Sequence, residues 1–181
     1  MNQAITKDDL AAKLKAIIRD VPDFPKKGII FKDITPLLAG HAAFSEMIKH
    51  FAAHYRNAGI TKVLGIEARG FLLAAPIAIE LGAGLVPVRK KGKLPYKTVS
   101  ATYALEYGTD TLEMHEDAVK GGEKVLIVDD VLATGGTAAA VCDLVEKLGG
   151  KTAGIAMLIE LEFLKGRAKL GDRPLYSLIK Y

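Results

Sequence analysis

The sequence predicts a single α/β domain, residues 1–181, built on a parallel β-sheet with helices on both faces. Short apolar runs alternate with stretches of helical periodicity along most of the chain. The runs lack the polar alternation of half-exposed strands, so helices are expected to cover both faces of the sheet. Half of the residues are apolar and one quarter are charged, a balance typical of a globular domain of this length.

Each expected element has a local signal in the sequence. Apolar runs predict buried strands at 62–66, 84–88, 124–128 and 153–159. Helical periodicity predicts helices at 42–57, 71–81 and 137–148. Two glycines after the third helix act as a stop signal. Residues 100–113 alternate around a glycine and predict a protruding β-hairpin.

The N-terminal segment predicts an amphipathic helix and not a signal peptide. Thr6 is a candidate N-cap with Asp9 three residues later, and Leu10 and Leu14 share one face. The segment lacks an apolar core followed by small residues, and no apolar run approaches the roughly 20 residues of a membrane-spanning helix. The single cysteine, Cys142, excludes an intramolecular disulfide. We therefore expect a cytoplasmic protein with an inert, packed thiol.

The charge of the chain favours a small anionic ligand. The net charge is +4 and the isoelectric point is about 9.0. Basic residues are dispersed, without a helix-turn-helix or zinc-finger pattern, which argues against nucleic acid. The one dense cluster, VPVRKKGKLPYK at 86–97, follows a predicted strand. Ligands of open α/β sheets bind beyond the carboxyl ends of the strands, so this cluster suits a small phosphorylated molecule.

The stretch VLIVDDVLATGGTA, residues 125–138, predicts a phosphate site. Its Thr-Gly-Gly-Thr turn lies between a strand and a helix, where glycines let the backbone approach a ligand and the helix dipole favours an anion. The turn lacks Gly-Lys-Ser/Thr, so it is not a Walker loop, and its spacing is not that of the dinucleotide fingerprint. By itself the turn would also serve as a helix cap.

Two adjacent acids, Asp129 and Asp130, precede that turn. A carboxylate repels a phosphate, so the acids are expected to meet another part of the ligand. Ionised carboxylates only accept hydrogen bonds, and a sugar diol donates two. The spacing therefore predicts a ribose 5-phosphate whose hydroxyl groups meet the acids and whose phosphate meets the turn.

This stretch resembles the phosphoribosyl pyrophosphate signature of the type I phosphoribosyltransferase family. The resemblance implies that family's fold, with N-terminal hood elements, a mobile hairpin lid, Mg²⁺ delivered with the donor, and a homodimer. The implied phosphoribosyl-binding residues are Asp129, Asp130, Ala133, Thr134, Gly135, Gly136 and Thr137. We call residues 133–137 the phosphate loop.

Five further stretches, at 24–38, 65–71, 89–95, 103–108 and 158–167, resemble the adenine phosphoribosyltransferases. The implied reaction converts adenine and 5-phospho-α-D-ribose 1-diphosphate to AMP and diphosphate, in purine salvage. The implied pyrophosphate-binding residues are Glu67, Ala68, Arg69, Gly70, Arg89, Lys90 and Lys93. We call residues 67–70 the pyrophosphate loop, and we predict a cis peptide at Glu67–Ala68.

The same resemblance assigns the remaining site residues. Adenine is expected to contact Ile30, Phe31, Lys32 and Leu161, with Lys32 standing where the family often has Arg. Tyr103, Glu106 and Tyr107 belong to the implied lid. Glu106 and Arg69 are the catalytic candidates: Glu106 would accept the proton of adenine N7, and Arg69 would stabilise the departing pyrophosphate.

Two other functions compete with this one. An enzyme of the same fold would use another base, such as xanthine, hypoxanthine or orotate, and the adenine-type stretches count against it. A non-catalytic regulator that senses the donor would usually carry an added DNA-binding module, for which the chain has no spare length. His50 and His54 are spaced to share a metal, but without a third ligand they are expected to be a surface pair.

Overall fold

The computed structural model describes residues 6–104 and 109–181, which form two compact units, Met1–His50 and Phe51–Tyr181. The N-terminal unit contains α1 (Lys7–Lys15), β1 (Arg19–Pro22), β2 (Ile30–Asp33), α2 (Thr35–Ala39) and most of α3 (His41–Tyr55). β1 and β2 pair as an antiparallel hairpin that the sequence analysis did not predict. None of the helices in the described part of the chain is long and apolar enough to cross a membrane.

The predicted N-terminal cap is confirmed. The backbone N–H of Asp9 donates to the Thr6 hydroxyl oxygen at 3.2 Å, and that hydroxyl donates to the Asp9 carboxylate at 2.6 Å. Leu10 and Leu14, one turn apart on α1, are fully buried. The cap and the buried stripe explain why the helix starts at Lys7.

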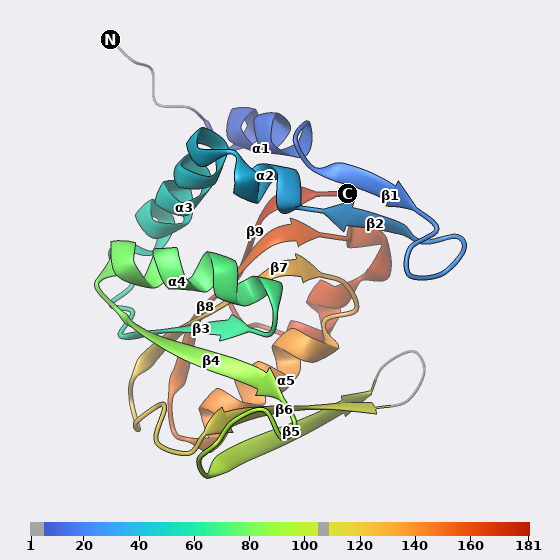
Figure 1. The fold of residues 1–181 in the computed structure, drawn as a ribbon. Helices are drawn as coiled ribbons and strands as arrows, with labels where there is room; N and C mark the ends of the chain where they lie inside the picture. Colours follow the sequence, from blue (N-terminus) through green and yellow to red (C-terminus); the bar gives the residue numbers. More distant parts are fainter. Residues whose placement is uncertain (1–5, 105–108) are drawn as a thin grey trace. The chain divides into compact units, whose positions relative to one another are not determined.

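The second unit is built on a seven-stranded sheet with the order β5-β6-β4-β3-β7-β8-β9 (Figure 1). The strands are β3 (Lys62–Ile66), β4 (Gly84–Lys90), β5 (Thr98–Ala104), β6 (Thr109–His115), β7 (Lys124–Leu132), β8 (Lys151–Glu160) and β9 (Leu175–Lys180). From β4 to β9 neighbouring strands run parallel, whereas the β5–β6 hairpin joins β4 antiparallel. The predicted parallel sheet is therefore present, and the predicted hairpin makes it mixed by adding two antiparallel strands at one edge.

Helices cover both faces of this sheet, as predicted. Leu64 and Ile66 of β3 share a buried cluster with Val141 of α5 (Gly136–Lys147). Gly65, between them, faces α4 (Arg69–Leu81), since a Cβ built on Gly65 would lie 2.8 Å from the Ala74 Cβ. Because successive strand residues point to opposite faces, α4 and α5 lie on opposite sides. The mixed α/β architecture of the predicted fold class is confirmed.

The chain ends with elements that had no sequence prediction. Two short 3₁₀ helices, η1 (Glu162–Leu164) and η2 (Gly166–Leu170), follow β8, and β9 then adds the last parallel strand. The backbone N–H of Leu161 donates to the carbonyl of Leu132 at 3.0 Å, which ties this segment to the end of β7. The C-terminal segment therefore returns to the edge where the predicted ligand loops lie.

Candidate active site

A cavity of about 450 Å³ lies at the carboxyl ends of β3 and β7 in the second unit. Many of its walls are residues predicted for the site: Glu67, Ala68, Arg69, Lys90, Tyr103, Asp129, Asp130, Ala133 and Thr137. The other lining residues are Ile66, Asp110, Leu112 and Val131. Residues from four separate stretches of the sequence thus meet in one hollow, which is where ligands of parallel sheets bind.

The pyrophosphate loop is held by the carboxylate of Glu67. The guanidinium of Arg89 donates to both Glu67 oxygens at 3.2 Å, and the backbone N–H of Lys90 donates to one of them at 3.0 Å. Burial raises the pKa of Glu67 in part, but the hydrogen bonds from Arg89 and Lys90 outweigh it and lower the pKa overall. The predicted cis peptide at Glu67–Ala68 is confirmed.

The basic segment after β4 is organised by the same arginine. A third N–H of Arg89 donates to the carbonyl of Lys93 at 2.9 Å, which closes the turn over residues 90–93. Lys90 lines the cavity and pairs with Asp110 at 3.3 Å, a partner that the sequence analysis missed. Asp110 lies on β6 of the hairpin, so only the antiparallel pairing of that hairpin with β4 brings it to Lys90. Through these contacts, Arg89 holds both the pyrophosphate loop and the turn over residues 90–93 in place.

Gly70 connects the pyrophosphate loop to the paired acids. A Cβ built on Gly70 would lie 2.8 Å from the Val128 carbonyl oxygen and 2.9 Å from an Asp129 carboxylate oxygen. Both distances are shorter than real Cβ atoms adopt. The start of α4 therefore packs against the end of β7 at a separation that only glycine allows.

The two acids share a buried and only partly compensated environment. Asp130 is 4% exposed, and one of its oxygens lies 2.9 Å from Arg69 Nε. That contact is an ion pair without hydrogen-bond geometry, and no described residue donates a hydrogen bond to this oxygen. Asp129 accepts the backbone N–H of Asp130 at 2.9 Å. The site thus holds a buried acceptor that a ligand hydroxyl would satisfy.

Burial dominates the titration of this acid pair. It raises the pKa of Asp129 well above its ordinary value, and the charge of Asp130 raises it further. Burial also raises the pKa of Asp130, against the opposing effect of the Arg69 guanidinium. A ligand that donates hydrogen bonds, or brings positive charge, would favour the ionised forms.

The phosphate loop is built from backbone. Gly135 has a φ of 81° and is the N-cap residue of α5, and no side chain caps that helix. Ala133 and Thr137 line the cavity, and Gly135 and Gly136 are buried. The first N–H groups of a 12-residue helix therefore start at the cavity, in an arrangement that suits an anion.

Gly166 of η2 packs directly against the phosphate loop, and the sequence analysis did not single it out. A Cβ on Gly135 would lie 2.2 Å from the Gly166 carbonyl oxygen, and a Cβ on Gly166 would lie 2.1 Å from the Ala133 carbonyl oxygen. Two backbones thus touch where neither can carry a side chain. The only local signal was the glycine itself, inside the stretch FLKGR.

The remaining predicted residues lie elsewhere. Ile30, Phe31 and Lys32 form β2 of the N-terminal unit, where Lys32 pairs with Asp20 at 2.7 Å. Leu161 follows β8 in the second unit. The predictions for Glu106 and Tyr107 fall outside the described residues.

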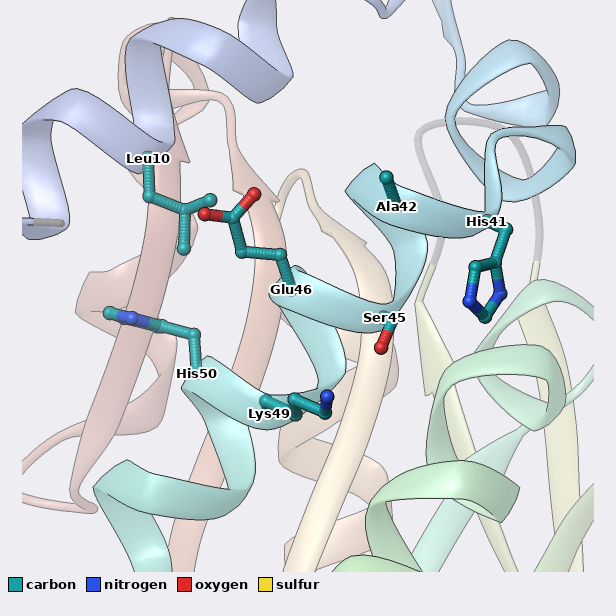
Figure 2. A pocket seen from close by; sticks show the side chains of 7 residues that line it. All are labelled: Leu10, His41, Ala42, Ser45, Glu46, Lys49 and His50. Carbon is teal, nitrogen blue, oxygen red and sulfur yellow. The ribbon is translucent and has the colours of Figure 1, made fainter. Parts of the chain in front are cut away.

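A second hollow, of about 550 Å³, lies in the N-terminal unit (Figure 2). Its lining residues are Leu10, His41, Ala42, Ser45, Glu46, Lys49 and His50. None of the predicted site residues lines it, and its carboxylate, Glu46, is already paired with Lys13. Although this hollow is the larger of the two, the charged residues at the strand ends make the 450 Å³ cavity the candidate site.

The structure also places the minor sequence signals, the histidines of α3 and Cys142. The His54 ring is stacked on Tyr176 with centroids 3.9 Å apart. Within the described residues, no group of three or more His, Cys, Asp or Glu side chains is arranged to hold a metal ion. Cys142 is buried, and burial raises the pKa of its thiol to about 11. The expected packed thiol is confirmed.

This fold and site define a phosphoribosyltransferase. A family model described as phosphoribosyl transferase domain matches residues 33–173. Adenine phosphoribosyltransferase from Geotalea daltonii is 57% identical over 93% of this chain and 99% of its own length. The Myxococcus xanthus adenine phosphoribosyltransferase is 54% identical over 98% of this chain and 97% of its own.

Solved structures agree with these relatives. Adenine phosphoribosyltransferase from Thermoanaerobacter pseudethanolicus superposes with a TM-score of 0.92 at 53% identity, covering 94% of this chain and 99% of that one. The Saccharomyces cerevisiae enzyme, complexed with D-2,5-dideoxy-2,5-imino-altritol 1,6-bisphosphate and adenine, gives 0.90 at 42% identity, with 94% and 99% coverage. The chain belongs to the phosphoribosyltransferase family and, within it, to the adenine phosphoribosyltransferases.

Proposed function

We propose that the protein transfers the phosphoribosyl group of 5-phospho-α-D-ribose 1-diphosphate to adenine, giving AMP and diphosphate, in a cytoplasmic purine salvage step. The observation that carries this proposal is the 450 Å³ cavity, which collects a half-buried and a buried acid, a backbone-built anion site and a cationic loop. These groups match the diol, the 5-phosphate and the pyrophosphate of one donor molecule. The membership of the chain in the adenine phosphoribosyltransferases supports adenine as the acceptor.

The acids and the phosphate loop would hold the part of the donor that is retained. The buried oxygen of Asp130 without a hydrogen bond is a ready acceptor for a ribose hydroxyl, and Asp129 lies beside it in the cavity. The N-terminus of α5, opened by Gly135, would take the 5-phosphate with Thr134 and Thr137 as added donors. Neither assignment requires a cationic side chain at the 5-phosphate.

The pyrophosphate loop would meet the group that leaves. Arg69 and Lys90 line the same cavity and supply positive charge where the negative charge of pyrophosphate develops. Cleavage at C1 of the ribose should have oxocarbenium-like character, which the carboxylates of Asp129 and Asp130 would stabilise. Arg89 and Lys93 are assigned to the same phosphate group, with Arg89 acting also through its brace on Glu67.

The residues of the cavity fit a Mg²⁺ ion that arrives on the donor. Mg²⁺ keeps several waters and is commonly bound through one or two carboxylates and substrate phosphates. The cavity offers a buried carboxylate oxygen without a hydrogen bond, and no described cluster of three protein ligands competes for the ion. When bound, Mg²⁺ would neutralise the charge of the departing pyrophosphate. Asp129 and Asp130 would lie near it, with the ribose hydroxyls between.

For adenine we propose Ile30, Phe31 and Leu161 as apolar contacts and the backbone near Lys32 as the reader of the amino-group edge. Glu106 would accept the N7 proton as N9 attacks C1. Closure of the β5–β6 hairpin over the donor, with Tyr103 in the cavity wall, is part of the same proposal.

We also propose a homodimer. Among the exposed large apolar side chains of the second unit, Leu72 is exposed by 51%, Ile79 by 81% and Leu85 by 47%. Leu72 and Ile79 lie two turns apart on one face of α4. Exposed apolar groups of this size on neighbouring elements are typical of surfaces that associate.

One assay tests the reaction. The purified protein is incubated with the donor, Mg²⁺ and one base at a time, and pyrophosphate release is measured. We expect turnover with adenine and little with hypoxanthine, xanthine or orotate. Turnover with another base in place of adenine would reject the assignment. Binding of the donor without turnover of any base would favour the regulator.

A further inference from the structure

Glu160, at the end of β8, is a buried carboxylate that pairs with the half-exposed side chain of Arg167, and the reaction described above does not use this pair. Its carboxylate is 5% exposed and accepts two hydrogen bonds from the guanidinium of Arg167, at 3.0 and 2.6 Å. The hydroxyl of Ser177 on β9 donates to the same carboxylate. Burial raises the pKa of Glu160 in part, but the bonds from Arg167 and Ser177 outweigh it and lower the pKa. The carboxylate is therefore ionised and fully engaged.

Arg167 follows Gly166 directly, and Gly166 is the residue whose backbone touches the phosphate loop. The fork of two parallel hydrogen bonds restricts Arg167 in both position and rotation. The geometry of the adjacent peptide is thereby restricted as well. At its other end the segment is anchored by Leu170, which is 1% exposed in the core that α5 shares.

The contact between Gly166 and the phosphate loop is closer than side chains allow. The Gly166 carbonyl faces Gly135, and the Gly166 Cα faces the Ala133 carbonyl. In Figure 1 the segment after β8 lies beside the loop that leads from β7 into α5. Neither backbone has room for a side chain at this contact, so the position of Gly166 and that of the loop depend on each other through close backbone packing.

We propose that the Glu160–Arg167 pair is a positioning device for the phosphate loop, acting through the backbone of Gly166. This inference rests on the proposed role of residues 133–137 in holding the 5-phosphate. Arg167 does not line the cavity, so it is a positioning residue and not a ligand contact. Its effect is expected to fall on ligands with a 5-phosphate and to spare pyrophosphate, because the pyrophosphate loop has its own brace in Arg89.

The test compares Arg167→Ala, Arg167→Lys and wild type by calorimetric titration with ribose 5-phosphate and, separately, with Mg²⁺-pyrophosphate. Arg167→Ala is expected to weaken ribose 5-phosphate binding about tenfold and to change pyrophosphate binding less than about twofold. Arg167→Lys keeps the charge without the fork, so partial recovery is expected. Equal losses for both ligands, or no loss for either, would overturn the inference.

The matched control is Arg173→Ala. Arg173 is also paired with two carboxylates, Asp143 and Glu146, but these lie in the second half of α5, outside residues 133–137 and 67–70. The control should bind both ligands as wild type does, and a loss equal to that of Arg167→Ala would overturn the inference. If Arg167→Ala does not fold, Arg167→Lys and Glu160→Gln replace it. Both should bind ribose 5-phosphate more weakly and pyrophosphate unchanged. If neither variant shows this selective loss of affinity, the positioning role is rejected.

The same titrations separate this inference from the proposed site. If wild type binds ribose 5-phosphate no better than ribose, the phosphate assignment fails and the inference falls with it. If Gly135→Ala abolishes ribose 5-phosphate binding and Arg167→Ala leaves it intact, the assignment of the phosphate loop is kept. Only the positioning role of Arg167 is then rejected.

Discussion

The two loops of the cavity would bind phosphate groups by different physical means in the proposed function. The phosphate loop is made of backbone N–H groups at a helix start, supported by a glycine contact from η2. The pyrophosphate loop is held by a charged side chain, because the Glu67 carboxylate accepts hydrogen bonds from the Arg89 guanidinium and from the backbone N–H of Lys90. In the proposed reaction the 5-phosphate stays in place throughout, and the pyrophosphate gains charge and departs. Rigid backbone dipoles suit the first task, and cations that respond to developing charge suit the second.

The largest expected effect is that of Gly135→Ala. The substitution needs a left-handed φ of 81° and places a Cβ 2.2 Å from the Gly166 carbonyl oxygen, so the loop must move. We expect ribose 5-phosphate binding to weaken by at least about a hundredfold. Calorimetric titration measures this loss.

Gly82→Ala is the control, since Gly82 has a similar φ of 65° and open space around it. It should cost about 1 kcal/mol of stability and leave binding unchanged. Unaltered binding in Gly135→Ala would show that the loop is not built by this contact.

Glu67→Gln should produce the opposite selectivity. It removes the charge that holds the Arg89 fork, so the pyrophosphate loop loses its brace and the phosphate loop does not. Binding of Mg²⁺-pyrophosphate should weaken about tenfold, with ribose 5-phosphate changed less than about twofold. Competition against the donor in initial-rate assays measures both. Glu146→Gln, which breaks a surface pair with Arg173, is the control. Equal losses of affinity for both ligands would contradict the idea that the two loops are held by separate contacts.

Asp129→Asn is expected to stabilise the ligand-free protein at neutral pH. Burial and the neighbouring charge raise the pKa of Asp129 in the folded state. Between the ordinary pKa and that raised value, unfolding releases a proton, so the stability of wild type falls as pH rises. The Asn variant should therefore be more stable by about 1 kcal/mol at pH 7 and lose this advantage in acid. Urea unfolding at pH 7 and pH 4 measures the difference. Two results would contradict the raised pKa of Asp129: no gain in stability from Asp129→Asn, or an equal gain from Asn in place of the exposed Asp143.

The smallest effect should distinguish neighbouring lysines. Lys90 lines the cavity and pairs with Asp110, whereas Lys91 is exposed and outside the cavity walls. Lys90→Ala is expected to raise the KM for the donor by about threefold to tenfold, and Lys91→Ala by less than about twofold. Steady-state kinetics at low and high salt measures both variants. The difference should shrink with added salt because the contact is partly exposed. Equal effects would mean that the segment acts only through its overall charge.

Much of the fold followed from local patterns. The predicted helix 71–81 starts two residues earlier, at Arg69, and the strand predicted at 62–66 has those bounds. Predictions succeeded where the apolar pattern extends over many residues, as on the buried face of α5 and in the continuous buried run of β8. The β1–β2 hairpin was not predicted because none of its strand residues is fully buried and they carry little apolar pattern. β9 was missed because its short mixed segment is buried only by pairing with β8.

The sequence by itself determined the order of the residues in the proposed donor site. Asp129, Asp130 and the phosphate loop are contiguous, so their order along the chain already specifies acids followed by a backbone anion site. The resemblance to the adenine phosphoribosyltransferases, now established by the relatives, added the reaction. The arrangement of contiguous residues can be predicted from sequence because a strand end and a helix start impose their geometry locally.

Tertiary structure alone decided what holds that site in shape. Arg89 and Glu67 are 22 residues apart, and Gly166 reaches the phosphate loop only because β8 lies beside β7. Such partners carry no local signal, since an arginine or glycine in a loop looks the same whether it braces a site or faces water. Their roles arise from distances that exist only once the sheet has formed, and a sequence pattern contains no distances between strands.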